Sequence, residues 1–286
     1  MHTRAADAVQ RRLDELIALR AGVDVAFFAE QAPRIARLCH AMAERFARGG
    51  RLIAVGSSAQ DQTDVRHVAV EFVHPVIVGK RALPAIGLVP AAGAVAEQVG
   101  LLAEPDDIVI AFGGDAGLAA AVGAARGRGC LTVAFAPIGA EWEGLPPGHD
   151  AFVDQELTET LYHLLWELVH VFFEHRGLLA GRSAGPVHDS GAASFLYPFL
   201  AEREDDLDAV LEDVRRSALM KAGEVAALRE RTLREGGAEL AGAAGALRAV
   251  FETGGTLLAF GNGGSATDAS DLVADLRSPP PGLHAR

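Results

Sequence analysis

The chain has 286 residues, half of them hydrophobic, and a formal net charge of −12 at pH 7. This length and apolar content are enough for one large domain or two ordinary ones. The acidic balance disfavours binding to nucleic acid or to an anionic membrane, because phosphate-rich partners need a basic footprint.

Cysteine usage and hydropathy favour a cytoplasmic protein. Cys39 and Cys130 are the only cysteines, and their wide separation is not that of a metal-ligand pair or a disulfide framework. The start of the chain has no signal-peptide pattern, and no run of about 18 apolar residues could cross a bilayer.

Up to residue 180, helical and strand patterns alternate, which predicts an α/β fold with a parallel sheet between two layers of helices. Two helices are predicted within residues 5–46. The remaining predicted elements are strands at 52–55, 85–89, 108–112 and 131–135, a short strand at 152–153, and helices at 63–73, 118–128 and 156–175.

Beyond residue 176 the composition shifts to Gly, Ala and Ser, which predicts a linker that we place at residues 181–204. Helical patterns follow at 202–213 and 217–251, then a strand at 256–260 and a helix at 266–276. A single parallel strand cannot satisfy its own backbone groups, so this strand is expected either to join another sheet or to belong to a longer domain.

The two halves share a repeated segment. Residues 49–56 (Gly-Gly-Arg-Leu-Ile-Ala-Val-Gly) match residues 254–261 (Gly-Gly-Thr-Leu-Leu-Ala-Phe-Gly) position for position, and a long helical segment precedes each. The chain is therefore predicted to contain an internal repeat.

The second copy continues into a glycine turn and then a helix. Glycines allow the backbone to approach an anion, and the first N–H groups of the helix carry its positive end. The turn therefore predicts phosphate binding, although such turns also occur where nothing binds. The residues concerned are Gly261, Asn262, Gly263, Gly264 and Ser265.

This turn and its helix closely resemble the sugar-isomerase (SIS) domain family, and most of all the phosphoheptose isomerases. The resemblance implies a three-layer α/β fold around a five-stranded parallel sheet and binding of a sugar phosphate. It covers residues 1–180 as one SIS domain and 205–286 as the N-terminal part of a second.

Within the first copy, residues 64–72 resemble the family motif of Asp, two residues, His, three residues and Glu. The resemblance implies that His67 and Glu71 bind zinc, that Glu71 acts as an acid/base, and that His170 on the last long helix completes the site. His67 and Glu71 are four residues apart on a predicted helix, so they share a face. Without the resemblance, a surface helix pair would be the favoured explanation.

The two copies depart from the family in opposite ways. In the first copy the turn that contains Ser57 and Ser58, our candidate phosphate ligands, is longer and poorer in glycine, and Asp115 stands in the second phosphate loop. In the second copy the glycine turn is intact, but Asp271 and Asp275 replace the His and Glu of the motif. Either both halves have drifted into binding or scaffold roles, or they pack as a pseudo-dimer with one composite site.

Two functions follow from these patterns. The first is an aldose–ketose isomerase acting on a sugar phosphate such as sedoheptulose 7-phosphate, with a zinc ion at the site. The second is a non-catalytic phosphosugar-binding module with a regulatory or scaffold role. A dinucleotide enzyme is disfavoured, because the third glycine of that fingerprint is missing. A homo-oligomer is expected, since the apolar helices exceed what one sheet needs.

Overall fold

The computed structural model describes residues 2–75, 77, 79–89, 94–179 and 206–279. The linker predicted at 181–204 lies outside these residues. At the centre is a parallel sheet of five strands in the order β2-β1-β3-β4-β5. The strands are β1 (Leu52–Gly56), β2 (Ala85–Leu88), β3 (Ile108–Phe112), β4 (Leu131–Ala134) and β5 (Trp142–Glu143). The predicted five-stranded parallel sheet is therefore confirmed.

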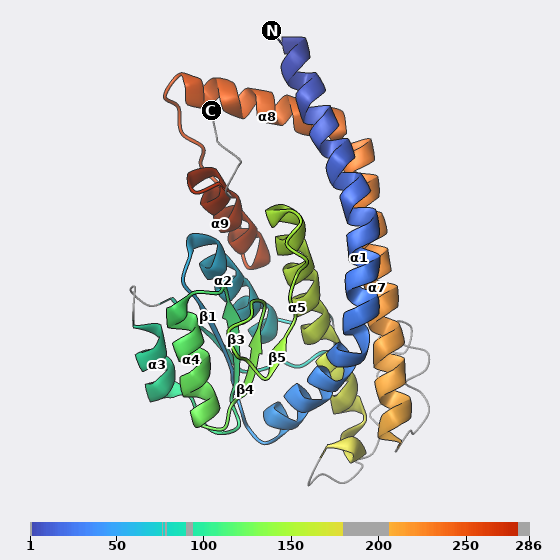
Figure 1. Ribbon diagram of the computed structural model, residues 1–286, viewed down its shortest axis with the longest axis vertical. Helices are drawn as coiled ribbons and strands as arrows, with labels where there is room; N and C mark the ends of the chain where they lie inside the picture. The colour runs from blue at the N-terminus through green and yellow to red at the C-terminus, as the bar shows by residue number, and fades with distance from the viewer. Residues whose placement is uncertain (1, 76, 78, 90–93, 180–205, 280–286) are drawn as a thin grey trace.

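Helices cover both faces of this sheet, as Figure 1 shows. One face carries α1 (His2–Ala47), α2 (Ala59–Val73) and α5 (Ala151–Glu174), and the other carries α3 (Val95–Leu102) and α4 (Ala116–Gly127). Alternate residues of β1 explain the two layers: Leu52 and Ala54 face the first group, and Ile53 and Val55 face the second. All five residues of β1 are buried, which is why the strand is apolar without interruption.

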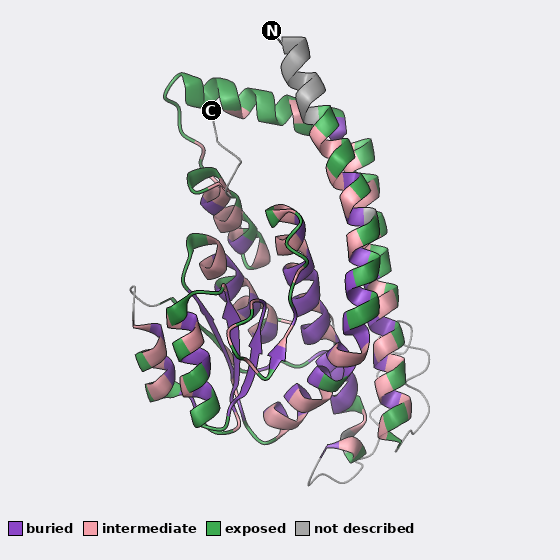
Figure 2. Cartoon of the chain, viewed as in Figure 1, coloured by how far each residue is buried: buried purple, intermediate pink, exposed green. Residues whose placement is uncertain are grey.

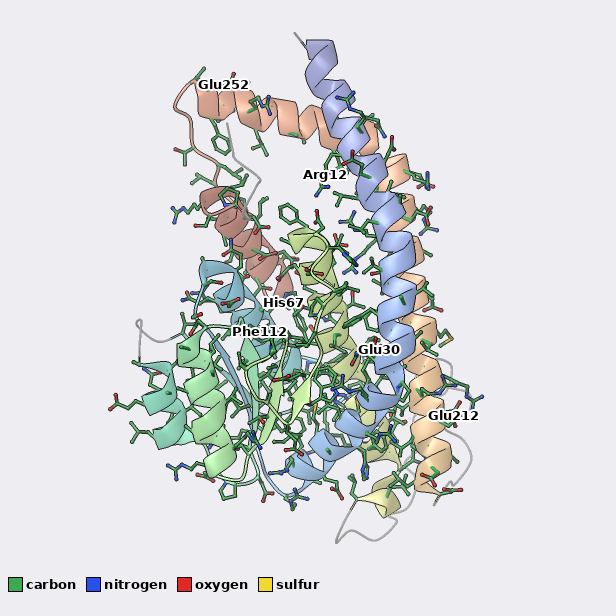
Figure 3. All side chains as sticks on the ribbon, viewed as in Figure 1. Arg12, Glu30, His67, Phe112, Glu212 and Glu252 are labelled. Atoms are coloured by element: carbon green, nitrogen blue, oxygen red, sulfur yellow. The ribbon has the colours of Figure 1, made fainter. Side chains whose placement is uncertain are left out.

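Several predicted elements are corrected by the structure. Residues 5–46 form the single helix α1, which contains Pro33 and bends near Glu30 (Figure 3); a proline removes one helical hydrogen bond and kinks a helix. Phe152 and Val153 begin α5 rather than forming a strand, and the fifth strand is β5. Helix α3 was not predicted, because its eight residues carry too short a pattern.

The second half packs on the first through helices. Helix α7 (Leu207–Glu235) lies along α1 and α5, while α8 (Gly237–Glu252) projects from the far end and is mostly exposed (Figures 1 and 2). Val210, Val214 and Ala218 of α7 are buried in the same core as α1 and α5. Much of the apolar helix surface that predicted an oligomer is thus covered within the chain itself.

The strand predicted at residues 256–260 is not formed. The segment is extended and pairs with no described strand, and Leu258 and Phe260 are 80% and 92% exposed. Helix α9 (Gly264–Arg277) follows it and packs against α2. A glycine turn and helix are therefore present in the second half, but their strand has no sheet to join in the described part of the chain.

A buried carboxylate ties together the starts of the central strands. Asp107 accepts hydrogen bonds from the Arg51 backbone N–H at 2.7 Å, the Arg51 guanidinium at 2.7 Å and the Glu104 N–H at 3.0 Å. Burial by itself would raise the pKa of Asp107, but these hydrogen bonds outweigh it and hold the pKa below its ordinary value of 3.8. The folded state therefore favours the ionised carboxylate.

We predict that Asp107→Asn lowers the free energy of unfolding by about 1–3 kcal/mol, because its amide would face N–H donors. Because the folded pKa of Asp107 is depressed, its stabilisation is present above pH 3.8 and is lost as the pH falls through the folded value. The variant should therefore lose stability less steeply below about pH 4, as measured by urea unfolding at several pH values. Asp106→Asn, which alters the neighbouring half-exposed carboxylate that pairs with Arg48, should change stability by only about 0.5 kcal/mol.

Candidate metal and sugar site

Helix α2 is set in place by its N-terminus and its buried face. Ser58 caps the helix, accepting from the Asp61 N–H at 3.0 Å, and the Asp61 carboxylate accepts from the Ser58 N–H at 2.9 Å. This reciprocal arrangement satisfies two of the backbone donors at the start of the helix. Val65, Val68 and Phe72 are fully buried, so the next faces of the helix turn toward α5 and α9.

Helix α5 runs beside α2 in the same direction. The Gln155 side chain donates to both oxygens of Asp64 at 2.9 and 3.0 Å, and further along the pair His163 Nδ1 lies 3.4 Å from Glu71 Oε1. Burial raises the pKa of Asp64 well above its ordinary value, and the hydrogen bond from the Gln155 amide offsets part of this rise. These contacts fix which residues of α5 face α2.

Three side chains from these helices converge. His67, Glu71 and His163 each offer a ligand atom, and these atoms lie within 4.8 Å of one another. The rings of His67 and His163 meet edge to face, with their centres 5.0 Å apart. Burial, followed by the proximity of His163, lowers the pKa of His67 and keeps its imidazole neutral at pH 7. Two imidazoles and one carboxylate form a donor set that suits a catalytic zinc ion.

The structure brings His67 and Glu71 together as predicted, but it does not bring His170 to them. His170 is buried, and its two ring nitrogens lie 2.7 Å from the Trp166 carbonyl and 3.0 Å from the Arg81 carbonyl. Both nitrogens are therefore engaged with backbone oxygens, which leaves neither to face a ligand in this arrangement. Burial also lowers the pKa of His170.

Helix α9 of the second half runs against α2 beside the same group. Asp268 Oδ1 lies 3.9 Å from His67 Nδ1, and Gly264 lies so near that a β-carbon built there would come within 4.0 Å of His67 Nε2. The Thr63 hydroxyl donates to Asp271 at 2.8 Å, and the Gln60 amide donates to the Ser278 carbonyl at 2.7 Å. Figure 3 labels His67 where α9, α2 and α5 meet.

Of the predicted phosphate ligands, Gly264 of the second turn lies near His67, while Ser57 and Ser58 are used differently. Ser58 caps α2, and the Ser57 hydroxyl donates to Asp115. Asp115 in turn caps α4, accepting from the Gly117 and Leu118 N–H groups at 2.6 and 3.1 Å. In the first half, the backbone N–H groups of both turns therefore donate to carboxylates of the chain itself, Asp61 and Asp115.

A cavity of about 350 Å³ opens between α2, α5 and the ends of β3 and β4. Its lining includes Asp61, Asp64, Phe112, Phe135, Asp154 and Gln155. The buried ring of Tyr162 connects it to the three converging side chains, because it lies 5.9 Å from the Phe112 ring and 5.5 Å from the His67 ring. Burial raises the pKa of Tyr162 well above its ordinary value, so the phenol stays neutral.

The curated proteins most useful for comparison are two phosphoheptose isomerases. The protein from Solidesulfovibrio magneticus is 31% identical over 172 residues, an alignment that covers 52% of this chain and 83% of that protein. The protein from Roseiflexus sp. is 32% identical over 164 residues and is covered to 82%. The chain belongs to the phosphoheptose isomerase family. Its five-stranded parallel sheet with helices on both faces is the fold that the resemblance implied.

The chain was also compared with solved structures and with models of protein families. A solved phosphoheptose isomerase structure from Francisella tularensis superposes with a TM-score of 0.46 at 19% identity, covering 55% of this chain and 97% of that one. A scan against models of protein families finds no match. Among the described residues, no helix is both long and apolar enough to cross a membrane.

The sequence pattern did not single out His163, which the structure brings together with His67 and Glu71. His163 and His170 recur on one predicted helix face together with Glu167, so the pattern alone could not choose between them. What the pattern does not give is the position of α5 along the axis of α2, which decides which histidine lies beside Glu71. Gln155, eight residues before His163, fixes that position through Asp64.

His170 is predicted to matter for stability. We expect His170→Ala to lower the free energy of unfolding by about 2–4 kcal/mol, because it opens a cavity in the core and removes the ring that contacts the Trp166 and Arg81 carbonyls. The measurement is chemical denaturation followed by circular dichroism. His149→Ala, at an exposed position, should stay within about 0.5 kcal/mol of the parent protein. A His170→Ala protein as stable as the His149→Ala protein would contradict the assignment.

Proposed function

We propose that the chain is an aldose–ketose isomerase that acts on a sugar phosphate, with sedoheptulose 7-phosphate as the first substrate to test. The observation that supports this most directly is the convergence of His67, Glu71 and His163 in a member of the phosphoheptose isomerase family. We propose that these three residues, rather than a set including His170, bind a zinc ion. Three protein ligands with an open position are typical of catalytic zinc.

The donor set fits such an ion chemically. His67 has a neutral imidazole, since its pKa is lowered by burial, and a metal ligand needs the free lone pair. Glu71 supplies an anionic oxygen, and all three residues are partly buried, which limits competition from water. A bound zinc ion would polarise the carbonyl oxygen of the sugar.

The protein side chains account for the proton movements. Isomerisation removes a proton from one carbon, forms an enediol and returns a proton to the adjacent carbon, so it needs a base that also acts as an acid. In the proposal Glu71 takes and returns the carbon-bound proton. In the proposal the ring nitrogen of His163 that does not face the zinc ion would relay a proton between the sugar oxygens, so no net proton is gained or lost.

The second half supplies the proposed phosphate site. Residues 261–263 precede α9, and Gly264 and Ser265 begin it. The helix has no side-chain cap, and its first N–H groups carry its positive end. Gly264 is adjacent to His67, so a phosphate there would lie beside the proposed metal. We therefore propose that residues 1–180 and 205–286 are tandem SIS-type units that share one composite site.

A second candidate, the non-catalytic phosphosugar-binding module, is favoured by the closed first-half turns. Asp61 and Asp115 occupy the helix N-termini that would otherwise bind an anion. A module of this kind would bind sugar phosphate through the second half without turnover. We further propose self-association, for which the exposed side chains Leu258, Phe260 and Phe251 offer an apolar surface.

Metal analysis separates the two candidates. The purified protein is expected to hold about one zinc ion per chain, as a three-ligand site would. His163→Ala should weaken zinc binding by more than the roughly 10–100-fold that loss of an outer-shell partner costs. His170→Ala should retain the ion whenever the protein is folded. Zinc lost from the second variant but kept by the first would refute the assignment of His163.

Turnover tests the reaction. Glu71→Gln should lower kcat for sedoheptulose 7-phosphate isomerisation by at least about 100-fold, because the amide cannot carry the proton. The variant should unfold at the same urea concentration as the parent protein. His149→Ala, at an exposed position, is the control and should keep full activity. Equal rates in the Glu71→Gln and parent proteins would exclude Glu71 as the base.

A further inference from the structure

The first half contains two helix N-termini that could each have bound a phosphate. They begin α2 and α4, which follow β1 and β3, the central strands at which the chain switches direction across the sheet. Ligands of such sheets bind outside the carboxyl ends of the strands at this point. Free N–H groups at both helix starts would make it an anion site.

Both positions already hold a carboxylate of the protein. Asp115 accepts from the Gly117 N–H at 2.6 Å and from the Leu118 N–H at 3.1 Å. Asp61 accepts from the Ser58 N–H at 2.9 Å and more weakly from the Ser57 N–H at 3.4 Å. The donors that a phosphate would use are therefore occupied by negative charges.

The backbone around these carboxylates is shaped to hold them. Gly113 has a φ of +94°, and a β-carbon added there would come within 2.5 Å of Asp61 Oδ2. At the end of β1, a β-carbon on Gly56 would come within 2.7 Å of Asp61 Cβ. The Ser57 hydroxyl joins the two groups by donating to Asp115. That hydrogen bond is the main cause of the lowered pKa of Asp115, which is thus ionised at neutral pH.

The adjoining cavity is also lined by acidic side chains, of which Asp64 and Asp154 have a pKa raised by burial. Asp61, Asp64 and Asp154 line it, together with the rings of Phe112 and Phe135. Carboxylates repel a phosphate dianion but accept hydrogen bonds from hydroxyl groups, and aromatic rings pack against the C–H faces of sugars. Its volume of about 350 Å³ lies in the range of small-ligand sites.

We infer that Asp61 and Asp115 take the place of a bound phosphate in the first-half turns, so that this cavity accepts the uncharged, hydroxyl-bearing part of a sugar and rejects a phosphate group. The identity of the sugar rests on the proposed function, but the rejection of phosphate does not. The two aspartates are specificity-determining residues: they leave the second-half turn as the place for a phosphate.

Amide NMR of the full-length protein with inorganic phosphate tests this site by site. In the parent protein, phosphate should leave the Gly117 and Leu118 amide signals unshifted. In Asp115→Ser, which keeps a helix-capping residue but removes the charge, the same signals should shift and saturate, with phosphate bound at least about tenfold more tightly than in the parent protein. Asp115→Asn, the better cap, provides a second variant should Asp115→Ser fail to fold.

The matched control is Asp206→Ser. Asp206 caps α7 in a similar manner, accepting from the Asp208 N–H at 2.9 Å, but α7 packs on α1 and α5 and not at the switch point of the sheet. This variant should gain no phosphate site at Gly117 and Leu118. A phosphate-induced shift of those two signals in the parent protein would overturn the inference. So would the absence of any gain in a folded Asp115→Ser or Asp115→Asn protein.

A pair of ligands that differ only in the phosphate group tests the cavity itself. Sedoheptulose should shift the amide signals of Phe112 and Phe135 in the parent protein, and sedoheptulose 7-phosphate should shift them without moving Gly117 or Leu118. No response of Phe112 and Phe135 to either sugar would overturn the assignment of the cavity. These outcomes are read without turnover, so an inactive protein would refute the isomerase proposal and leave the phosphate-rejection result intact.

Discussion

The rotation of α2 about its own axis is the constraint on which the site depends. Val65, Val68 and Phe72 are each fully buried against the core, which fixes the inner face of the helix. Asp64, His67 and Glu71 then lie on the face that α5 and α9 cover. A helix turned by one residue would expose apolar side chains and direct the imidazole and carboxylate elsewhere. The packing of α2 in the core therefore also sets the direction in which His67 and Glu71 point.

Helix α5 meets that face through two polar contacts of different character. Near its start, the Gln155 amide hydrogen-bonds to the buried carboxyl of Asp64, and further along His163 approaches Glu71. Glu159 lies between them in sequence, and burial raises its pKa to about 6. The groove between the helices thus contains carboxyl groups whose charge is costly, which is the environment in which a metal ion or a hydroxyl-rich ligand is favourable.

The two halves differ in how the N-termini of their helices are capped. In the first half, carboxylates close the helix N-termini, whereas α9 of the second half begins at a glycine turn without a side-chain cap. Packing of α9 on α2 places that uncapped turn beside His67. The apolar segment before it has no sheet to join, and Leu258 and Phe260 are exposed as a result. In the part of the chain that the structure describes, the second half therefore contacts the first mainly through its helices.

The sequence by itself determined the four longer strands of the sheet and two of the three converging side chains. Apolar runs of about five residues between turn signals, such as residues 108–112, indicate buried strands, and His67 and Glu71 share a helix face because the helix repeat requires it. Both features depend on neighbours in the chain. The choice of His163 over His170 depends on how far α5 slides along α2, and the position of Gly264 depends on the packing of α9. Those contacts join residues far apart in sequence. Periodic patterns relate residues within one helix or strand only, so the tertiary structure alone decided these contacts.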